Sequence, residues 1–213
     1  QGQDPKVLYP DIFTNGSVYL DLAFDMRAMP QELLPLTEVF ARALFEVGTE
    51  TEDYVKLSQR IGKSTGGIYG SSVTATLPGS RKSRADPTLP RKSTMSQANE
   101  MLSILRDVLL TVKFDNKERL KQIVMEEKAG LEAGLAPAGH RFANMRLRSQ
   151  FGGTGYINDQ TKGIGYLFAL RELATEIDKK WANVLKKLET IRETLINSKT
   201  LLCNVTLDAH NWK

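Results

Sequence analysis

The sequence has little of what disulfide-bonded and many catalytic proteins depend on. Cys203 is the only cysteine among 213 residues, and His140 and His210 are the only histidines. A single cysteine excludes an internal disulfide framework and agrees with a reducing compartment. It lies in the apolar, strand-like run TLLCNVTLD, which favours an inert buried thiol over a nucleophile.

Long apolar runs are also missing. No stretch approaches the ~20 residues that a helix needs to span a bilayer, so we expect no membrane partner. The first residues, QGQDPKVLYPDIFTNG, contain no charged segment followed by an apolar stretch. We therefore expect no signal peptide and a protein that is not secreted.

The motifs of metal and nucleotide chemistry are absent. The sequence contains no HExxH, HxxEH or G-x-S-x-G, and STGGIYG lacks the Lys-Ser/Thr pair and helix of a phosphate loop. A zinc site needs several ligands converging on one point, and neither His140 nor His210 has acidic residues at a ligand spacing. A Ser/His/Asp triad, built from spatial neighbours, has no motif in its support. We predict no catalytic residue, no cofactor-binding residue and no metal ligand in this chain.

Two charged sets have ordinary interpretations beside functional ones. Glu126 and Glu127 lie on a predicted helix between Lys121 and Lys128, as on a solvated face with partners four residues away. The other set consists of three arginines that do not form one tight helical stripe, namely Arg141, Arg146 and Arg148. A glycosidase-like carboxylate pair and an anion site remain the alternatives.

Positive charge is concentrated in one segment. The net charge is +4, and the segment GSRKSRADPTLPRK carries an excess of the same size. Its charged residues are Arg81, Lys82, Arg84, Asp86, Arg91 and Lys92. Because aromatic residues are missing from it, the segment does not resemble a nucleic-acid surface, and we expect no nucleic-acid partner. Its serines and prolines predict a mobile loop over 79–94 and only a short returning strand.

Hydrophobic periodicity predicts the elements. Apolar residues alternate in SVYLDLAFDM, which is typical of a half-buried strand. QELLPLTEVFARALFEVGTE, residues 31–50, has apolar residues at helical spacings and Gly48 where a helix would stop. Further helices are predicted at 51–64, 96–112, 116–135, 137–151, 166–178 and 179–198, strands at 67–78 and 200–208, and a glycine-rich hinge at 152–165.

This order of elements predicts an α+β fold, an antiparallel sheet with helices packed on one face. We expect a lead-in segment over 1–16, a single domain over 17–208 and a tail over 209–213.

Three blocks of sequence carry a family resemblance. The run from TNGSVYLDLAFDM to GKSTGGI resembles the presequence protease branch of the pitrilysin–insulinase family of zinc peptidases, which are inverzincins. So do ERLKQIVMEEKAGLEAGLAPAGHRFANMRLRSQF and GYINDQTKGIGYLFALRELATEIDKKW. The resemblance implies four homologous α+β domains around a peptide-sized chamber. The zinc motif HxxEH would lie in the first, an assisting arginine and tyrosine in the fourth, and this chain would be the non-catalytic third.

The same resemblance implies that residues 31–50 correspond to the zinc-binding helix of the family's first domain. Setting Gly48 on the glycine that ends the zinc helix puts Val39, Arg42 and Ala43 where His, Glu and His would be. A branched apolar group, a guanidinium and a methyl group do not bind Zn²⁺. The resemblance therefore implies zinc in the parent enzyme's first domain and none here.

The resemblance implies a structural domain of a zinc endopeptidase that degrades presequences and other unfolded peptides, forming part of the chamber wall. Its partners would be neighbouring domains of the same chain and the peptide substrates. It would lie in the cytoplasm of a bacterium or in a mitochondrion or chloroplast. The alternatives are a separate subunit that pairs with a catalytic chain, and a free-standing hydrolase. An isolated fragment would be able to dimerise through exposed apolar surface.

Overall fold

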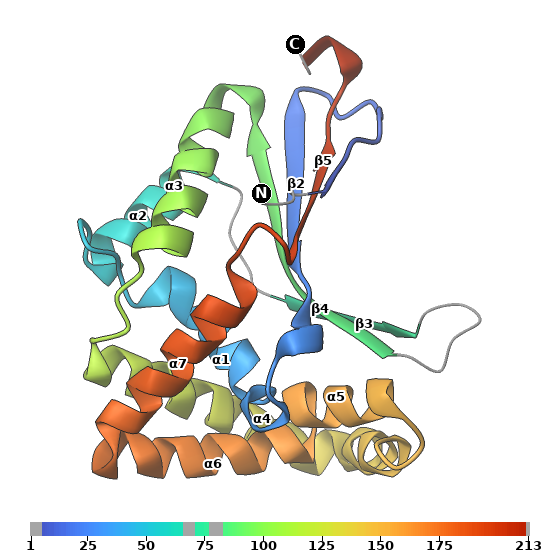
Figure 1. Cartoon of the computed structure of the whole chain (residues 1–213), viewed down its shortest axis with the longest axis vertical. Helices are drawn as coiled ribbons and strands as arrows, with labels where there is room; N and C mark the ends of the chain where they lie inside the picture. Colours follow the sequence, from blue (N-terminus) through green and yellow to red (C-terminus); the bar gives the residue numbers. More distant parts are fainter. Residues whose placement is uncertain (1–5, 66–70, 77–82, 212–213) are drawn as a thin grey trace.

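A five-stranded sheet forms one layer of the molecule, and the helices lie to one side of it (Figure 1). The computed structural model describes residues 6–65, 71–76 and 83–211. The strand order is β1-β5-β2-β4-β3. The strands are β1 (Lys6–Leu8), β2 (Ser17–Phe24), β3 (Ser71–Thr76), β4 (Ser83–Thr94) and β5 (Leu201–Thr206). The predicted α+β class is confirmed, but the sheet is mixed because β1 runs parallel to β5.

The central strand β2 has the predicted alternation. Val18, Leu20, Leu22 and Phe24 are buried, whereas Tyr19 between them is exposed. Side chains of a strand point alternately to its two faces, so one face of the sheet packs on the helices and the other meets solvent.

The expected lead-in and tail are not separate from the domain. Within the described part of the lead-in, β1 pairs with β5, and the Thr14 backbone N–H donates to Asp208 Oδ1 at 2.8 Å. The Ala209 N–H, in the expected tail, donates to Asp11 Oδ1 at 2.9 Å. β1 is short and exposed, so it lacks the hydrophobic alternation by which a half-buried strand is recognised in a sequence.

The predicted loop over 79–94 is wrong for its described residues, since Ser83–Thr94 form β4; residues 79–82, with Arg81 and Lys82, lie outside the described residues. β4 pairs with β3 up to Thr88 and with β2 from Thr88 onward. Pro87, opposite Ser72, and Pro90, opposite Asp21, each lie where one edge of β4 is unpaired. Successive backbone nitrogens of a strand face opposite edges, so the nitrogens of Pro87 and Pro90, three residues apart, also face opposite edges. Each proline can therefore have its missing N–H at the edge where β4 has no partner strand.

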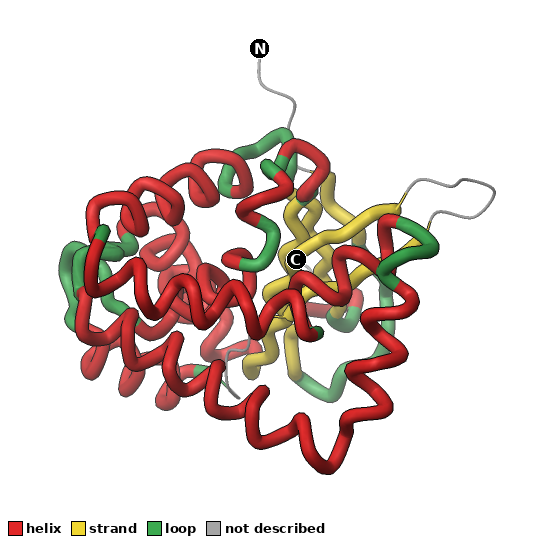
Figure 2. Tube along the Cα trace, turned by 90° about the horizontal axis from the view of Figure 1, so that it is seen from below, coloured by secondary structure: helices red, strands yellow, loops and turns green. Residues whose placement is uncertain are grey.

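Seven α-helices are described, and none of them is long and apolar enough to cross a membrane. Figure 2, seen from below, shows them gathered beside and beneath the strands. The helices are α1 (Leu36–Glu46), α2 (Tyr54–Ser64), α3 (Ala98–Thr111), α4 (Lys117–Arg148), α5 (Gly153–Lys162), α6 (Ile164–Lys179) and α7 (Trp181–Leu195).

One helical prediction is confirmed and one needs correction. The helices expected at 116–135 and 137–151 are the two parts of α4, which are separated by a kink at Ala138 (φ −121°, ψ 26°) directly after Pro137. A proline inside a helix removes a hydrogen bond and kinks the axis. The glycine-rich hinge expected at 152–165 is largely α5. Gly155 allows α5 to turn back on α4, since a Cβ there would overlap the backbone carbonyl of Arg148.

The helix predicted over 31–50 is confirmed in its central part. A 3₁₀ turn at Gln31–Leu33 leads into α1, and the chain leaves the helix through Gly48, whose φ is +104°. Glycine is the residue that adopts this backbone readily. A Cβ at Gly48 would also lie 2.9 Å from the backbone oxygen of Glu52.

Replacing Gly48 by alanine should therefore lower the free energy of unfolding by about 1–3 kcal/mol, from the positive φ and the close contact together. Urea unfolding followed by circular dichroism measures the change. Gly62→Ala is the matched control, because Gly62 lies in α2 with no atom within 4 Å of an added Cβ. It should be neutral or stabilising by about 0.5–1 kcal/mol. Equal losses for both variants would contradict the explanation.

Candidate functional site

The charged residues of α1 form a single stripe. Glu38, Arg42 and Glu46 follow one another at intervals of four, which places them on one face of the helix. Of the eleven residues of α1, eight are buried, so nearly everything outside this stripe belongs to the core. Arg42 lies in the middle of the stripe, with 27% of its side chain exposed.

Arg42 is held by carboxylates from two helices. Its Nε donates to Glu46 Oε1 at 2.7 Å within α1, and its Nη1 donates to Glu127 Oε1 of α4 at 3.1 Å. Its Nη2 donates to Glu126 of α4 and also to Glu46 Oε2 at 3.2 Å. A guanidinium offers donors in a fixed planar fork, which suits this simultaneous binding. We call Arg42 with Glu46, Glu126 and Glu127 the Arg42 cluster.

A second arginine binds Glu46 at the carboxyl end of α1. Arg119 of α4 donates from Nη2 to Glu46 Oε2 at 2.5 Å and from Nε to the Glu46 backbone oxygen at 3.0 Å. Its guanidinium also lies 5.0 Å from the ring centre of Tyr54, a cation–π contact. A positive group at the carboxyl end of a helix is favourable, because it meets the partial negative charge there.

The cluster favours the charged forms of Arg42 and Glu126. Burial by itself would lower the pKa of Arg42, but the hydrogen bonds to Glu46, Glu126 and Glu127 outweigh it and raise the pKa. The hydrogen bond from Arg42 lowers the pKa of Glu126 below its ordinary value. A carboxylate of low pKa that is already bound to a cation is a poor general base at neutral pH.

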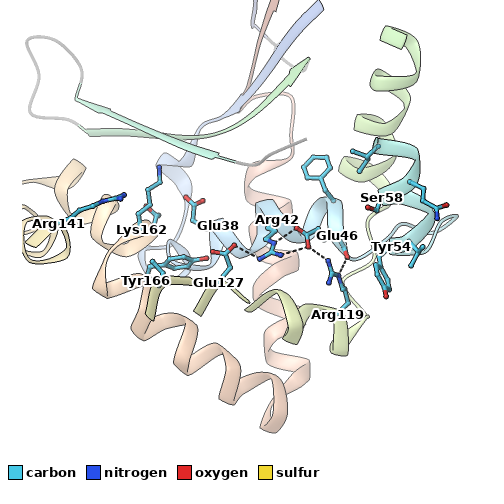
Figure 3. A pocket seen from close by; sticks show the side chains of 16 residues that line it. Glu38, Arg42, Glu46, Tyr54, Ser58, Arg119, Glu127, Arg141, Lys162 and Tyr166 are labelled. Carbon is cyan, nitrogen blue, oxygen red and sulfur yellow. Dashed lines mark hydrogen bonds and ion pairs between the residues drawn. The ribbon is translucent and has the colours of Figure 1, made fainter. Parts of the chain in front are cut away.

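The cluster lies along a large cavity between α1, α2, α4, α5 and α6 (Figure 3). Its volume is about 870 Å³, which is in the range of cavities that bind small ligands. Figure 3 shows Arg141 and Lys162 at one end of the cavity, Arg42 in the middle, and Tyr54 and Arg119 at the other end. The remaining lining residues are Glu38, Phe45, Glu46, Val55, Ser58, Gln59, Ile61, Glu127, Leu131, Thr161 and Tyr166.

The three positions compared with a zinc motif separate in the structure. Val39 and Ala43 are buried in the core, with 1% and 0% exposure, and only Arg42 reaches the cavity. These residues do not fit zinc, because none of them offers a lone pair to a metal. No group of three His, Cys, Asp or Glu side chains that could hold a metal occurs among the described residues. That the chain holds no metal, cofactor or catalytic residue remains a prediction.

The structure does not bring the two histidines or the cysteine into this cavity. His140 and His210 are exposed and do not line it. Cys203 lies on β5, and burial raises the pKa of its thiol. It is half-buried rather than fully buried as predicted, and a raised pKa leaves less of the reactive thiolate.

The acidic pair on α4 is the main residue set that sequence reasoning misread. Glu126 and Glu127 bind Arg42, 84 and 85 residues away, rather than lysines of their own helix. Lys121 instead donates to Asp178 of α6 at 2.8 Å. The sequence offered one signal, the spacing of four residues between the charged residues of α1, which is otherwise mostly apolar. This spacing does not identify Glu126 and Glu127 as the partners of Arg42.

The three arginines of α4 have separate environments, as the sequence predicted. Arg141 lines the large cavity, Arg146 donates to the fully buried Asp159 at 2.6 Å, and Arg148 is exposed.

Comparison with known sequences identifies the family. The model of the family described as peptidase M16-C associated matches residues 2–173. The chain belongs to this family. The predicted resemblance to the presequence protease branch is confirmed.

Two relatives show how much of a longer protein the family member covers. "Presequence protease 1, chloroplastic/mitochondrial" from Arabidopsis thaliana is 32% identical over 203 residues, which is 95% of this chain and 19% of that protein. "Protein HypA" from Clostridium perfringens is 29% identical over 196 residues, 92% of this chain and 20% of that protein. The chain thus spans about a fifth of the length of these relatives.

A solved structure shares the fold. The inactive domain of a peptidase M16 from Pseudomonas fluorescens superposes with a TM-score of 0.63 at 16% identity, over 96% of this chain and 44% of that one. At this identity the match supports the α+β architecture alone.

Arg42→Met should lower the free energy of unfolding by about 2 kcal/mol, because three carboxylates lose their shared cation in a partly buried place. Urea unfolding at neutral pH measures the loss. Arg106→Met is the control, since that side chain is 75% exposed and 3.7 Å from its partner Asp107. It should change stability by less than about 0.5 kcal/mol. A tolerated Arg42→Met would show that the cluster does not support the fold.

The Arg42 cluster should also make stability depend on pH in acid. The pKa of Glu126 is lowered in the folded chain from its ordinary 4.5, so the unfolded chain binds more protons as pH falls through this region. The stabilising contribution of the ionised Glu126 is present above about pH 4.5 and is lost as the pH falls through the pKa of Glu126 in the folded chain. Unfolding measured between about pH 6 and pH 3 should show a steeper loss for the natural chain than for Arg42→Met. Parallel curves would contradict this assignment.

Proposed function

We propose that this chain is a non-catalytic structural domain of a zinc metalloendopeptidase that degrades presequences and other unfolded peptides. The observation that carries the proposal is the Arg42 cluster on α1. A guanidinium bound by three carboxylates stands on the helix where the family resemblance puts the metal-binding residues. The match to the peptidase-associated family and the relatives named presequence proteases support the same function.

The chemistry of the cluster suits a structural role. A metal ion in a peptidase lowers the pKa of a bound water and polarises a carbonyl group. The Arg42 guanidinium neutralises carboxylates around it, but it cannot act as a Lewis acid and cannot be deprotonated in a protein. Arg42 therefore joins α1 to α4 without supplying a reactive centre. Zinc would belong to another domain of the parent enzyme.

Surface composition supports packing against neighbouring domains. Phe13 and Phe151 are 82% and 87% exposed, whereas phenylalanine is usually buried in a folded protein. The chain spans about a fifth of its relatives, so much of the surrounding protein would be available to cover these rings. We infer that the domain forms part of a chamber wall that admits only unfolded peptides. Alone, the chain would be able to dimerise through the same rings.

The location follows from the relatives. Those from Arabidopsis thaliana and Yarrowia lipolytica are named chloroplastic/mitochondrial and mitochondrial, and HypA comes from a bacterium. We therefore place the parent enzyme in an organelle or in the bacterial cytoplasm, with neither nucleic acid nor membrane as a partner.

The 213-residue chain should show no turnover of a quenched-fluorescence peptide, with or without added zinc, because α1 carries Val39, Arg42 and Ala43. Metal-dependent cleavage by a homogeneous preparation would overturn the proposal in favour of a free-standing hydrolase. Sequencing the complete reading frame is the companion measurement. An HxxEH motif in the same frame supports a domain of one chain, whereas co-purification with a separate HxxEH protein supports the alternative of a paired subunit.

A further inference from the structure

A second cavity, of about 700 Å³, runs along α6. Its lining includes Gly165, Phe168, Glu172 and Glu176 of this helix, together with Glu32 from the segment that leads into α1. α6 itself runs along the lower edge of the molecule in Figure 1. From Gly165 to Glu176 the helix rises about 17 Å, which corresponds to about five residues of an extended peptide. We call this cavity the α6 groove.

The α6 groove offers an apolar surface. Phe168 lines it and is 55% exposed, although phenylalanine is usually buried in a folded protein. The buried side chains of Leu36 and Leu173 line the same space. Ligand sites are typically lined by apolar and aromatic side chains, with a few polar groups that fix the orientation of the ligand. The exposed ring of Phe168 is therefore available to a side chain of a ligand.

The two cations that line the groove are neutralised at its ends. At one end, a Cβ on Gly165 would lie 2.8 Å from Asp159 Oδ2, and this oxygen accepts a hydrogen bond from Arg146 at 2.6 Å. At the other end, Lys187 donates to Glu176 Oε2 at 2.6 Å. Each cation thus has a carboxylate of its own, and the two pairs contribute little net charge to the groove.

The middle of the groove carries negative charge that is not neutralised. Glu172 lies two turns beyond Gly165 and one turn before Glu176 on α6. Glu172 and Glu32 are exposed, and within the described part of the chain they form neither a hydrogen bond nor an ion pair. Two carboxylates without a cation favour a positively charged group at this place.

One side chain of a ligand can reach both the ring and a carboxylate. Phe168 and Glu172 are four residues apart, so their Cβ atoms lie about 5–6 Å from each other on one face of α6. Lysine and arginine have a long apolar stem with the charge at its tip. The stem can therefore lie on the Phe168 ring while the charge meets Glu172. A cation near the face of an aromatic ring is itself favourable.

We propose that the α6 groove binds peptides through a lysine or arginine side chain, with Glu172 as its ion-pair partner and Phe168 as the apolar contact for its stem. Glu32 strengthens the negative potential of the groove. Apolar residues next to the cation in the peptide would contact Leu36 and Leu173. The choice of a peptide as the ligand rests on the proposed function, since binding here would retain peptides in the parent enzyme apart from the chemical step.

Fluorescence anisotropy of the 213-residue chain tests the proposal with peptides of about six residues that carry a neutral label. All are acetylated and amidated, so that only side chains carry charge. The first has one lysine between leucines, and the second has glutamine in place of the lysine. We expect the lysine peptide to bind about fivefold more tightly at low salt, which is about 1 kcal/mol. The difference should disappear at about 1 M salt, where charges are screened beyond about 3 Å.

Variants locate the binding. Glu172→Gln should weaken binding of the lysine peptide about fivefold and leave the glutamine peptide unaffected, because it removes the charge alone. Phe168→Ala should weaken both peptides about threefold or more, because both lose the apolar contact. Glu193→Gln is the matched control, since Glu193 is an exposed glutamate of α7 that does not line the groove. It should change neither affinity.

Each of four results would overturn the inference. Three concern peptides: equal affinity for the lysine and glutamine peptides at low salt, affinities unchanged by both groove variants, or no binding of either peptide. The fourth is a dimer of the chain in light scattering that Phe168→Ala converts to a monomer, because a second copy would then occupy the groove. The proposed function is decided separately, by the reading frame and by peptidase activity. Lysine binding that requires Glu172 would stand even if the parent protein proved not to be a peptidase.

Discussion

The burial of α1 is the constraint on which the rest of the structure depends. This helix contacts α2, α3, α4, α5, α7 and β3, so little of its surface is left for water. Its charges can therefore occupy only one stripe, and a charge held there must be neutralised by a neighbour. Arg42 meets that condition through Glu46 on its own helix and Glu126 and Glu127 on α4.

The same arrangement explains how α1 and α4 pack together across several carboxylates. Carboxylates gathered around a partly buried point repel one another unless a cation lies among them. A guanidinium provides that cation permanently and binds several oxygens in one plane. Arg42 thus holds α1 against α4.

The errors of sequence reasoning come from residues whose neighbours change their meaning. Proline normally argues against a strand, yet Pro87 and Pro90 are tolerated because β4 exchanges one partner for another at Thr88. Glycine normally suggests a hinge, yet Gly155 serves a close approach of α5 to the end of α4. In both cases the local preference is real, but the partner element decides how it is satisfied.

The sequence by itself determined the α+β class, the alternation in β2, the amphipathic α1 and its end at Gly48, because each depends on residues close together in the chain. Only the tertiary structure decided that Arg42 meets Glu126 and Glu127, that β1 joins β5, and that Arg141 and Tyr166 share a cavity. Periodicity states which side of an element is buried. It does not state which distant element will cover that side, since this depends on how all the buried faces pack together.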